Sequence, residues 1–110
     1  MNKERYCVVV STFPTKKEAK KAAKKLLKER LAACAQISKI KSLYHWEGKI
    51  ERSKEYQLKL KSRVDNFVEI EQELSAIHPY ETPQIVMLPI VGANSSYLEW
   101  IDKELGGGDI

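Results

Sequence analysis

Residues 37–61 read ISKIKSLYHWEGKIERSKEYQLKLK and contain two runs in which apolar and polar side chains alternate. Such alternation is typical of β-strands with two different faces. Glu47-Gly48 separates the runs, and an X-Gly pair in that place indicates a β-hairpin. Each arm spans ten residues or more, whereas the usual strand has ~5–6. We therefore expect the hairpin to project beyond its domain and to pair with another chain.

The residues before the hairpin predict a strand and a helix. Tyr6–Ser11 is a short apolar run rich in β-branched residues, as in a buried strand, and Phe13-Pro14 ends it. Thr15 and Glu18 then form the pattern of a capping box, which starts a helix. The residues that recur with the helical period on one face are Ala19, Ala22, Ala23, Leu26, Leu27 and the stem of Arg30.

The residues that flank the hairpin lead into and out of helices. Small residues at Leu31–Gln36 lead from the first helix to the hairpin. A second capping signal lies at Ser62–Asp65, and apolar residues at helical spacing follow over Val64–Ile77. His78-Pro79 ends this helix, because a residue before proline avoids the α region.

The last part of the chain predicts a strand and a short helix. Ile85–Val91 has the apolar composition of a strand. Pro89 has no N–H to donate, which favours an edge position for this strand. Asn94 is a residue type that caps helices, and it predicts a last helix that runs to about Lys103.

The order of elements is β-α-β-β-α-β followed by a helix, which is the ferredoxin-like arrangement of the α+β class. In it, two helices cover one face of a four-stranded sheet. We expect a single domain over residues 1–105 and a flexible tail at 106–110. The basic first helix and the acidic second helix would lie side by side. Cys7 and Cys34 would lie on strands that are not neighbours, too far apart for a disulfide.

Composition and charge argue against several classes of protein. The 110-residue chain has a net charge of +4, of which residues 16–30 contribute +6 and the rest −2. A solvated lysine face explains this better than nucleic-acid binding, because RNA-recognition sheets need stacking aromatic residues and Tyr56 is the only one in the third strand. We expect no nucleic-acid partner.

The hydropathy pattern argues against a membrane protein. The longest uncharged run, Thr82–Leu98, contains Pro83 and Pro89, and we expect no membrane partner. The first residues lack the apolar segment of a signal peptide, and two cysteines are too few for a disulfide scaffold. These features predict a cytoplasmic protein.

Three groups of residues are candidates for chemistry. The aromatic cluster Tyr44-His45-Trp46 either packs across a subunit interface or lines a ligand site. In the rigid loop His78–Pro83, His78 is either a hydrogen-bonded structural residue or an imidazole ligand for copper or zinc, with Glu81 or a thiol nearby. Cys34 is either a soft metal ligand or a small buried apolar residue. No nucleophile–base pair, phosphate loop or paired-carboxylate motif is apparent, so the residues themselves indicate no reaction.

Four motifs, in order and at matching spacing, carry a resemblance to a known family. They are Glu29-Arg30-Leu31-Ala32-Ala33-Cys34-Ala35, Ser42-Leu43-Tyr44-His45-Trp46-Glu47-Gly48-Lys49-Ile50-Glu51, His78-Pro79-Tyr80-Glu81-Thr82-Pro83 and Tyr97-Leu98-Glu99-Trp100. They resemble the CutA divalent-cation tolerance family from Val8 to Ile101. The resemblance implies a homotrimer held together by long hairpins, a cytosolic location, tolerance of copper and other divalent metals, no enzymatic reaction, and a likeness to trimeric PII signalling proteins.

The resemblance also implies site residues. His78 matches the family's proposed copper ligand, and Cys34 matches its Ala-Cys-Ala segment. Ser11 and Ile77 stand where some members have a cysteine and a histidine, which should weaken binding of soft metals. We therefore expect a weakly bound divalent cation at His78, Cys34 and Glu81. The residues that match those lining the cleft between subunits are Tyr44, Trp46, Lys61, His78, Tyr80 and Glu81.

Two alternatives to metal binding follow from the same residues. A PII-like sensor would bind a small anion or metabolite in the cleft between subunits through Lys61, Tyr44 and Trp46. A scaffold protein would instead present its surface to a protein partner.

Overall fold

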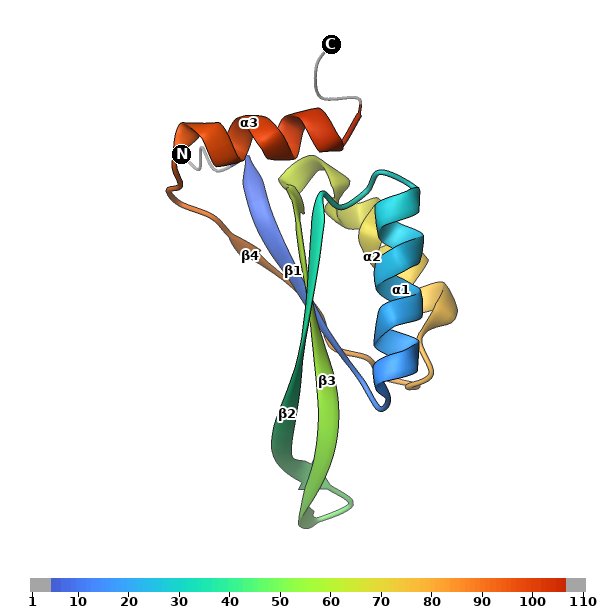
Figure 1. Cartoon of the computed structure of the whole chain (residues 1–110). Coiled ribbons are helices and arrows are strands. Elements are labelled where there is room, and N and C mark those ends of the chain that lie inside the picture. Colours follow the sequence, from blue (N-terminus) through green and yellow to red (C-terminus); the bar gives the residue numbers. More distant parts are fainter. Residues whose placement is uncertain (1–4, 107–110) are drawn as a thin grey trace.

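The computed structural model describes residues 5–106 of the chain and has the predicted order of elements (Figure 1). The elements are β1 (Tyr6–Phe13), α1 (Lys16–Lys28), β2 (Cys34–Trp46), β3 (Lys49–Arg63), the 3-10 turn η1 (Val64–Asn66), α2 (Phe67–Ile77), β4 (Ile85–Pro89) and α3 (Ser95–Glu104). The predicted tail, apart from Gly106, lies outside the described residues, and the single-domain assignment stays a prediction.

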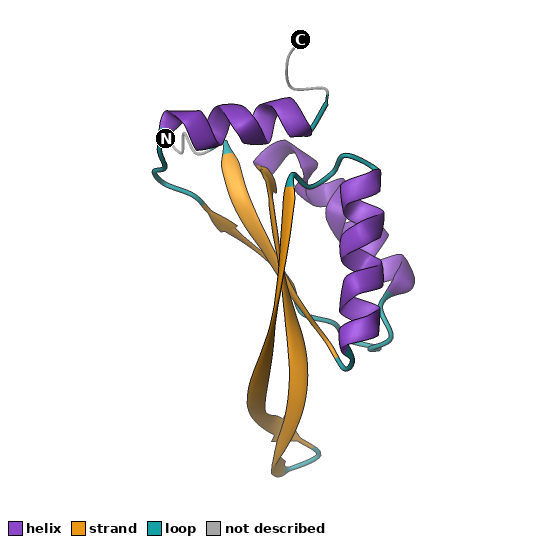
Figure 2. Cartoon of the chain, in the orientation of Figure 1, coloured by secondary structure: helices purple, strands orange, loops and turns teal. Residues whose placement is uncertain are grey.

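The four strands form one antiparallel sheet in the order β2-β3-β1-β4. Helices α1 and α2 cover one face of it, while α3 lies across the end opposite the hairpin turn (Figure 2). This confirms the ferredoxin-like α+β prediction. It also confirms that Pro89 lies on an edge strand. Because β3 separates β1 from β2, Cys7 and Cys34 do not face each other, and both are free.

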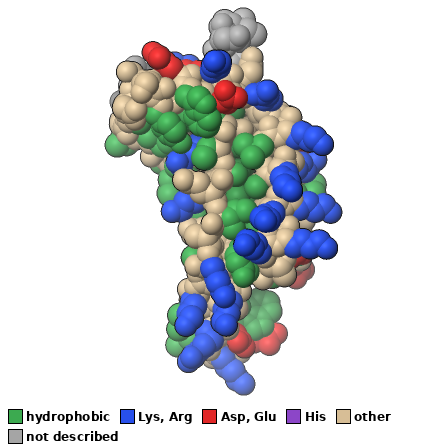
Figure 3. Space-filling view, in the orientation of Figure 1, with side chains coloured by type: hydrophobic (Ala, Val, Ile, Leu, Met, Phe, Trp, Pro, Cys, Tyr) green, Lys and Arg blue, Asp and Glu red, His purple; other side chains and the backbone are tan. Residues whose placement is uncertain are grey.

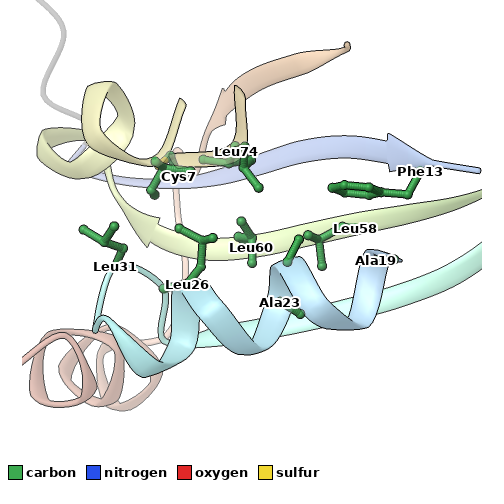
Figure 4. Close-up of a cluster of buried hydrophobic side chains, with 13 residues drawn as sticks. Cys7, Phe13, Ala19, Ala23, Leu26, Leu31, Leu58, Leu60 and Leu74 are labelled. Atoms are coloured by element: carbon green, nitrogen blue, oxygen red, sulfur yellow. The ribbon is translucent and has the colours of Figure 1, made fainter. Parts of the chain in front are cut away.

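The hydrophobic core lies between the helix-facing side of the sheet and the two helices (Figure 4). Register places Val9 opposite Leu60, and both side chains are fully buried. The small residues of α1 let the helix approach the strands closely. The buried residues drawn together here include Cys7, Phe13, Ala19, Ala23, Leu26, Leu31, Leu58, Leu60 and Leu74. Burying a leucine of this kind contributes about 1.5–3 kcal/mol.

Helix α1 begins where the sequence predicts and ends earlier. The Glu18 amide donates to Thr15 Oγ1 at 3.1 Å, as in a capping box. The helix stops at Lys28, so the expected helical position of Arg30 is wrong. Arg30 has a φ of 61°, and its guanidinium donates to the backbone oxygen of Glu104 at 2.9 Å. Leu27, predicted to face the core, is 36% exposed, because it lies at the margin of the apolar stripe.

Two other bounds differ from the predictions. Strand β2 begins at Cys34 rather than Ile37, because Cys34 and the two residues after it already pair with β3. The capping signal at Ser62–Asp65 does not start α2 directly. Ser62 belongs to β3 and donates to the backbone oxygen of Leu31 at 2.6 Å, and η1 comes between β3 and α2.

Helices α1 and α2 carry opposite charges side by side, as the sequence predicts. The Lys25 ammonium lies 3.1 Å from a Glu73 carboxylate oxygen and 2.9 Å from one of Glu29. Hydrogen bonds to Glu29, and then to Glu73, raise the pKa of Lys25. These side chains are about one third exposed, so water screens the pair and it orients the helices more than it stabilises them.

Helix α3 is held against the end of the sheet by polar contacts and one apolar residue. Tyr6 donates to Asp102 at 2.7 Å, and the Arg63 guanidinium donates to the same carboxylate at 3.0 Å. Ile101 is fully buried beneath the helix. Asn94 is the N-cap residue, as predicted, but its amide donates to the Ser96 hydroxyl rather than capping the helix with its side chain.

The long hairpin is confirmed. Strands β2 and β3 have 13 and 15 residues and extend past both covering helices (Figure 1). Glu47 and Gly48 form the turn with φ values of 51° and 79°, the positive values that a two-residue hairpin loop needs. Among residues 5–106, no helix has the length and apolar character needed to cross a membrane.

Candidate functional site

His78 lies just after the end of α2, against the end of β1. Its Nε2 is 3.1 Å from Ser11 Oγ, and its Nδ1 accepts a hydrogen bond from the Tyr80 amide at 3.2 Å. The ring also stacks on Phe13, with centroids 4.3 Å apart and planes 19° apart. The proline of His78-Pro79 ends the helix, so the chain turns back here and brings the imidazole against the strand.

The hydrogen bonds determine which nitrogen of His78 carries the proton. Because Nδ1 accepts from an amide, the neutral ring is protonated at Nε2 and donates to Ser11 Oγ. Burial lowers the pKa of His78, so the ring is neutral near pH 7. A neutral imidazole is the form that binds metals, yet its one free lone pair is already used by the Tyr80 amide.

Tyr80 joins the same loop to the hairpin. Its hydroxyl donates to Glu55 Oε2 at 2.7 Å, and the Glu55 side chain is 8% exposed. Burial, and then the hydrogen bond to Glu55, raise the pKa of Tyr80 well above its ordinary value. Further along the hairpin, Ser53 Oγ donates to the Tyr44 hydroxyl at 3.3 Å. Hydrogen bonds around the loop after α2 therefore link four polar residues, Ser11, His78, Tyr80 and Glu55.

Lys61 and Cys34 form a second group near α3. They are opposite each other in the β2–β3 ladder. Lys61 Nζ donates to the Tyr97 hydroxyl at 3.2 Å and lies 5.4 Å from the centre of the Tyr97 ring. Tyr97 in turn stacks on Trp100 at 5.7 Å. This places a cation beside the Tyr97 ring, which Trp100 extends.

The predicted cleft residues do not meet within one chain. Tyr44 pairs with Glu51, and Trp46 with Lys49, at the free end of the hairpin. Lys61 lies ten positions after Glu51 in β3, which corresponds to about 33 Å of strand. A cleft that contains Lys61 together with Tyr44 and Trp46 therefore needs residues from more than one chain.

The predicted metal ligands are also separated. In the sheet, Cys34 of β2 pairs with Lys61 of β3, and Lys61 pairs with Val8 of β1. His78 instead contacts Ser11, which lies three residues further along β1. Along β1, Val8 and Ser11 are about 10 Å apart, and two strand spacings add a similar distance across the sheet. Glu81 is exposed on the loop that contains His78. Within the part of the chain that the structure describes, no three His, Cys, Asp or Glu side chains are grouped as a metal site. These residues of one chain therefore do not fit a resident metal ion.

Two members of the polar network escaped prediction from the sequence. Ser11 is a polar residue on the inward-facing side of an apolar strand, and that position is a signal for a buried partner. Glu55 occupies a polar position in the alternating pattern of its strand, which predicts that it is exposed. No nearby residue in the sequence indicates that the Tyr80 hydroxyl binds it. Ser11 and His78 do not form a nucleophile–base pair. Ser11 is 1% exposed, and the imidazole donates the proton rather than accepting it.

Comparison with known proteins extends over most of the chain. The family model described as CutA1 divalent ion tolerance protein matches residues 7–104. The divalent-cation tolerance protein CutA of Pyrococcus horikoshii is 41% identical over 97 residues, which cover 88% of this chain and 95% of that protein. The protein of the same name from Archaeoglobus fulgidus is 44% identical over 92 residues, 84% of this chain and 90% of that protein.

A solved structure is similar in both sequence and fold. It is described as the periplasmic divalent cation tolerance protein CutA from Archaeoglobus fulgidus, and it matches with a TM-score of 0.89 and 40% identity. The match covers 91% of this chain and 98% of that one. Sequence and fold therefore agree on the family.

Proposed function

The chain belongs to the CutA1 divalent ion tolerance protein family, and we propose that it contributes to tolerance of copper and other divalent cations without catalysing a reaction. The observation that carries the proposal is the position of His78 within the family match. Of the two histidines, His45 is exposed on the hairpin, whereas His78 is half-buried in a polar network. Its neutral imidazole becomes available as a ligand for Cu(II) when the Tyr80 amide releases Nδ1.

We propose that cation binding at His78 is weak. A metal ion at either ring nitrogen has to replace the hydrogen bond to Ser11 or the one from the Tyr80 amide. Glu81, three residues further along the exposed loop, can supply a carboxylate. Cys34 could join these two only if it came from a neighbouring subunit, since it lies apart from them in its own chain.

Titration of the purified protein with Cu(II), followed by calorimetry, tests this proposal. We expect His78→Ala to weaken binding at least tenfold. The matched control, His45→Ala, should change it less than twofold, because His45 is the only other imidazole in the chain. Equal binding by the parent and His78→Ala would contradict the proposal. A loss confined to His45→Ala would show that Cu(II) binds adventitiously at the exposed hairpin.

We also propose that the protein is a homotrimer. The hairpin exposes Leu43 at 67%, Trp46 at 58% and Ile50 at 72%, although these are large apolar side chains. On and after the edge strand β4, Leu88 is 52% exposed and Val91 84%. Exposed apolar surfaces of this extent favour association. Multi-angle light scattering should give three times the chain mass of 12.6 kDa, and a single species of 12.6 kDa would contradict this.

A second candidate function is favoured by the environment of Lys61. Lys61 is half-buried and its ammonium contacts Tyr97, which stacks on Trp100. This environment would suit a small anion in a cleft between subunits. Replacing Trp100 with phenylalanine leaves Trp46 as the only tryptophan and thus as a probe of this cleft. Its fluorescence should respond to inorganic phosphate or succinate, and Lys61→Gln should abolish the response. An unchanged spectrum with both anions would contradict this function.

We propose a cytoplasmic location on the basis of the two free cysteines, which are typical of a reducing compartment. The Archaeoglobus structure is described as periplasmic, so the two locations compete directly. Immunoblots of fractionated cells test the proposal, which predicts the protein in the cytoplasmic fraction. Its recovery in the periplasmic fraction would contradict the proposal.

A further inference from the structure

The projecting hairpin separates its charges between its two faces. Side chains alternate between the two faces along β2 and β3, also beyond the core. Every second residue therefore lies on the face that continues the helix-covered side of the sheet. Those with a positive charge are Lys39, Lys41, Arg52 and Lys54. The strand carboxylates of this region, Glu51 and Glu55, lie on the other face. One face of the hairpin therefore carries four positive charges and no carboxylate.

This face contains a pair of like charges in direct opposition. Lys41 and Lys54 are partners in the β2–β3 ladder, which brings their Cβ atoms to about 4.5–5.5 Å. Lys39 follows two residues away on the same side of β2, and all three side chains are exposed. Among residues 5–106, no carboxylate forms an ion pair with any of them. Like charges directly opposite each other destabilise a sheet, so the arrangement costs stability.

The same lysines surround a hollow. A surface cavity of about 300 Å³ is lined by Lys39, Ile40, Lys41 and Lys54. Three ammonium groups around one such space offer up to nine hydrogen-bond donors and three positive charges. The chemical group that matches this set is a compact anion with several negative charges.

The wider surface has the same sign. Strands β2 and β3 together contain eight basic and two acidic residues, a net charge of +6. Residues 16–30 are therefore not the only basic region of the chain. The residues outside 16–30 have a net charge of −2 only because residues 64–110 have a net charge of −8. Figure 3 shows lysine and arginine side chains over α1 and over the hairpin on one side of the molecule.

We propose that the Lys39–Lys41–Lys54 hollow binds an oligophosphate, an anion with two or more linked phosphate groups. Lysine ammonium groups are compact charges that bind phosphate oxygens without demanding a planar partner. On this face of the hairpin, Tyr56 is the aromatic residue nearest the lysines, and it packs against the core. The one exposed ring on this face, His45, lies four residues from Lys41, about 13 Å along β2, so no base-stacking partner adjoins the lysines. The hollow therefore suits phosphate groups better than single-stranded nucleic acid. The site is separate from His78 and from Lys61.

Calorimetric titration of the full chain with sodium tripolyphosphate tests the proposal. The double variant Lys41→Gln/Lys54→Gln removes the opposed charges and should weaken binding at least tenfold. The matched control is Lys24→Gln/Lys28→Gln, which removes the same charge from exposed positions on α1. It should weaken binding less than threefold. Because the hairpin variant also removes repulsion, we expect it to unfold at an equal or higher urea concentration than the parent.

Titrations with other ligands identify which chemical group the hollow recognises. ATP should bind within threefold of tripolyphosphate, because the base gains no stacking partner, and orthophosphate should bind at least tenfold more weakly. The proposal is overturned if the parent binds no tripolyphosphate, or if the hairpin and α1 variants lose the same affinity, which would indicate diffuse attraction. It is also overturned if a single-stranded RNA oligonucleotide binds more tightly than tripolyphosphate, because that would indicate a nucleic-acid surface.

Discussion

The two ends of the sheet are built from the same two strands and have opposite surroundings. Near α3, the strand β3 supplies Lys61 and Arg63, whose polar atoms reach Tyr97 and Asp102. Near the turn, the same pair of strands exposes Leu43, Trp46 and Ile50. One end is completed by its own chain, whereas the other has no such cover among the described residues. The difference supports the proposed association of chains through the hairpin.

Apolar substitutions should separate the two ends most strongly. Leu60→Ala, in the core, should lower the free energy of unfolding by about 2–5 kcal/mol, because it leaves a cavity in a fully buried site. Leu43→Ala, on the hairpin, should change the folding of one chain by less than about 0.5 kcal/mol.

Urea denaturation at two protein concentrations measures both effects. If Leu43→Ala lowers the free energy of unfolding more after tenfold dilution, the Leu43 side chain acts between chains, since association couples stability to protein concentration. Equal losses for Leu43→Ala and Leu60→Ala at all concentrations would break the comparison.

The polar contacts of α3 should have the next largest effect. Asp102→Asn should cost about 1–2 kcal/mol, because it weakens charge-assisted hydrogen bonds from Tyr6 and Arg63. Although burial alone would raise the pKa of Asp102, these two hydrogen bonds hold it below its ordinary value. The group therefore stabilises the fold above the ordinary carboxyl pKa of about 3.9, and this contribution is lost as the pH falls.

Chemical denaturation at pH 3 and pH 6 measures this dependence. The loss of stability of the parent between the two pH values should exceed that of Asp102→Asn. Asp65→Asn, at an exposed position, serves as the control and should behave like the parent. If Asp102→Asn kept the full pH dependence, α3 would not be fastened through this carboxylate.

His78 should give a smaller effect at a different pH. Because its pKa in the folded protein is lowered by burial, the unfolded chain takes up a proton first as the pH falls below about 6.5. Stability should therefore decrease between pH 7 and pH 5, with a slope below that of one proton per chain.

His78→Gln should remove this slope, and His45→Gln on the hairpin should leave it unchanged. Urea midpoints at pH 5, 6 and 7 provide the measurement. A slope that survives in His78→Gln would mean that another group titrates in this range.

The hairpin turn should give the smallest effect, and it should be a gain. Glu47 has a φ of 51°, a left-handed conformation that asparagine adopts more easily than glutamate. Glu47→Asn should therefore stabilise the protein by about 0.5 kcal/mol, measured by thermal unfolding. Glu51→Asn makes the same change of charge at an ordinary strand position and should bring no gain. A destabilising Glu47→Asn would show that the glutamate side chain has a contact of its own at the tip.

Sequence reasoning predicted the fold better than the site, for a physical reason. Alternation and helical spacing are local signals, and they were sufficient for the hairpin, the helices and the edge position of Pro89. They failed at Arg30, where the chain leaves the helix to reach α3. The network of Ser11, Glu55 and Tyr80 depends on residues far apart in the chain, which no local pattern specifies.

The strand order β2-β3-β1-β4 has a consequence for synthesis of the protein. A ribosome that has made the chain as far as Trp46 has made β1 and β2, which are not neighbours in the sheet. Strands β3 and β4, made afterwards, are not neighbours either. All three ladders of the sheet therefore join the half made before the Glu47-Gly48 turn to the half made after it. Strands β1 and β2 are therefore synthesised before either has a strand to pair with, and they become parts of one sheet only when β3 lies between them.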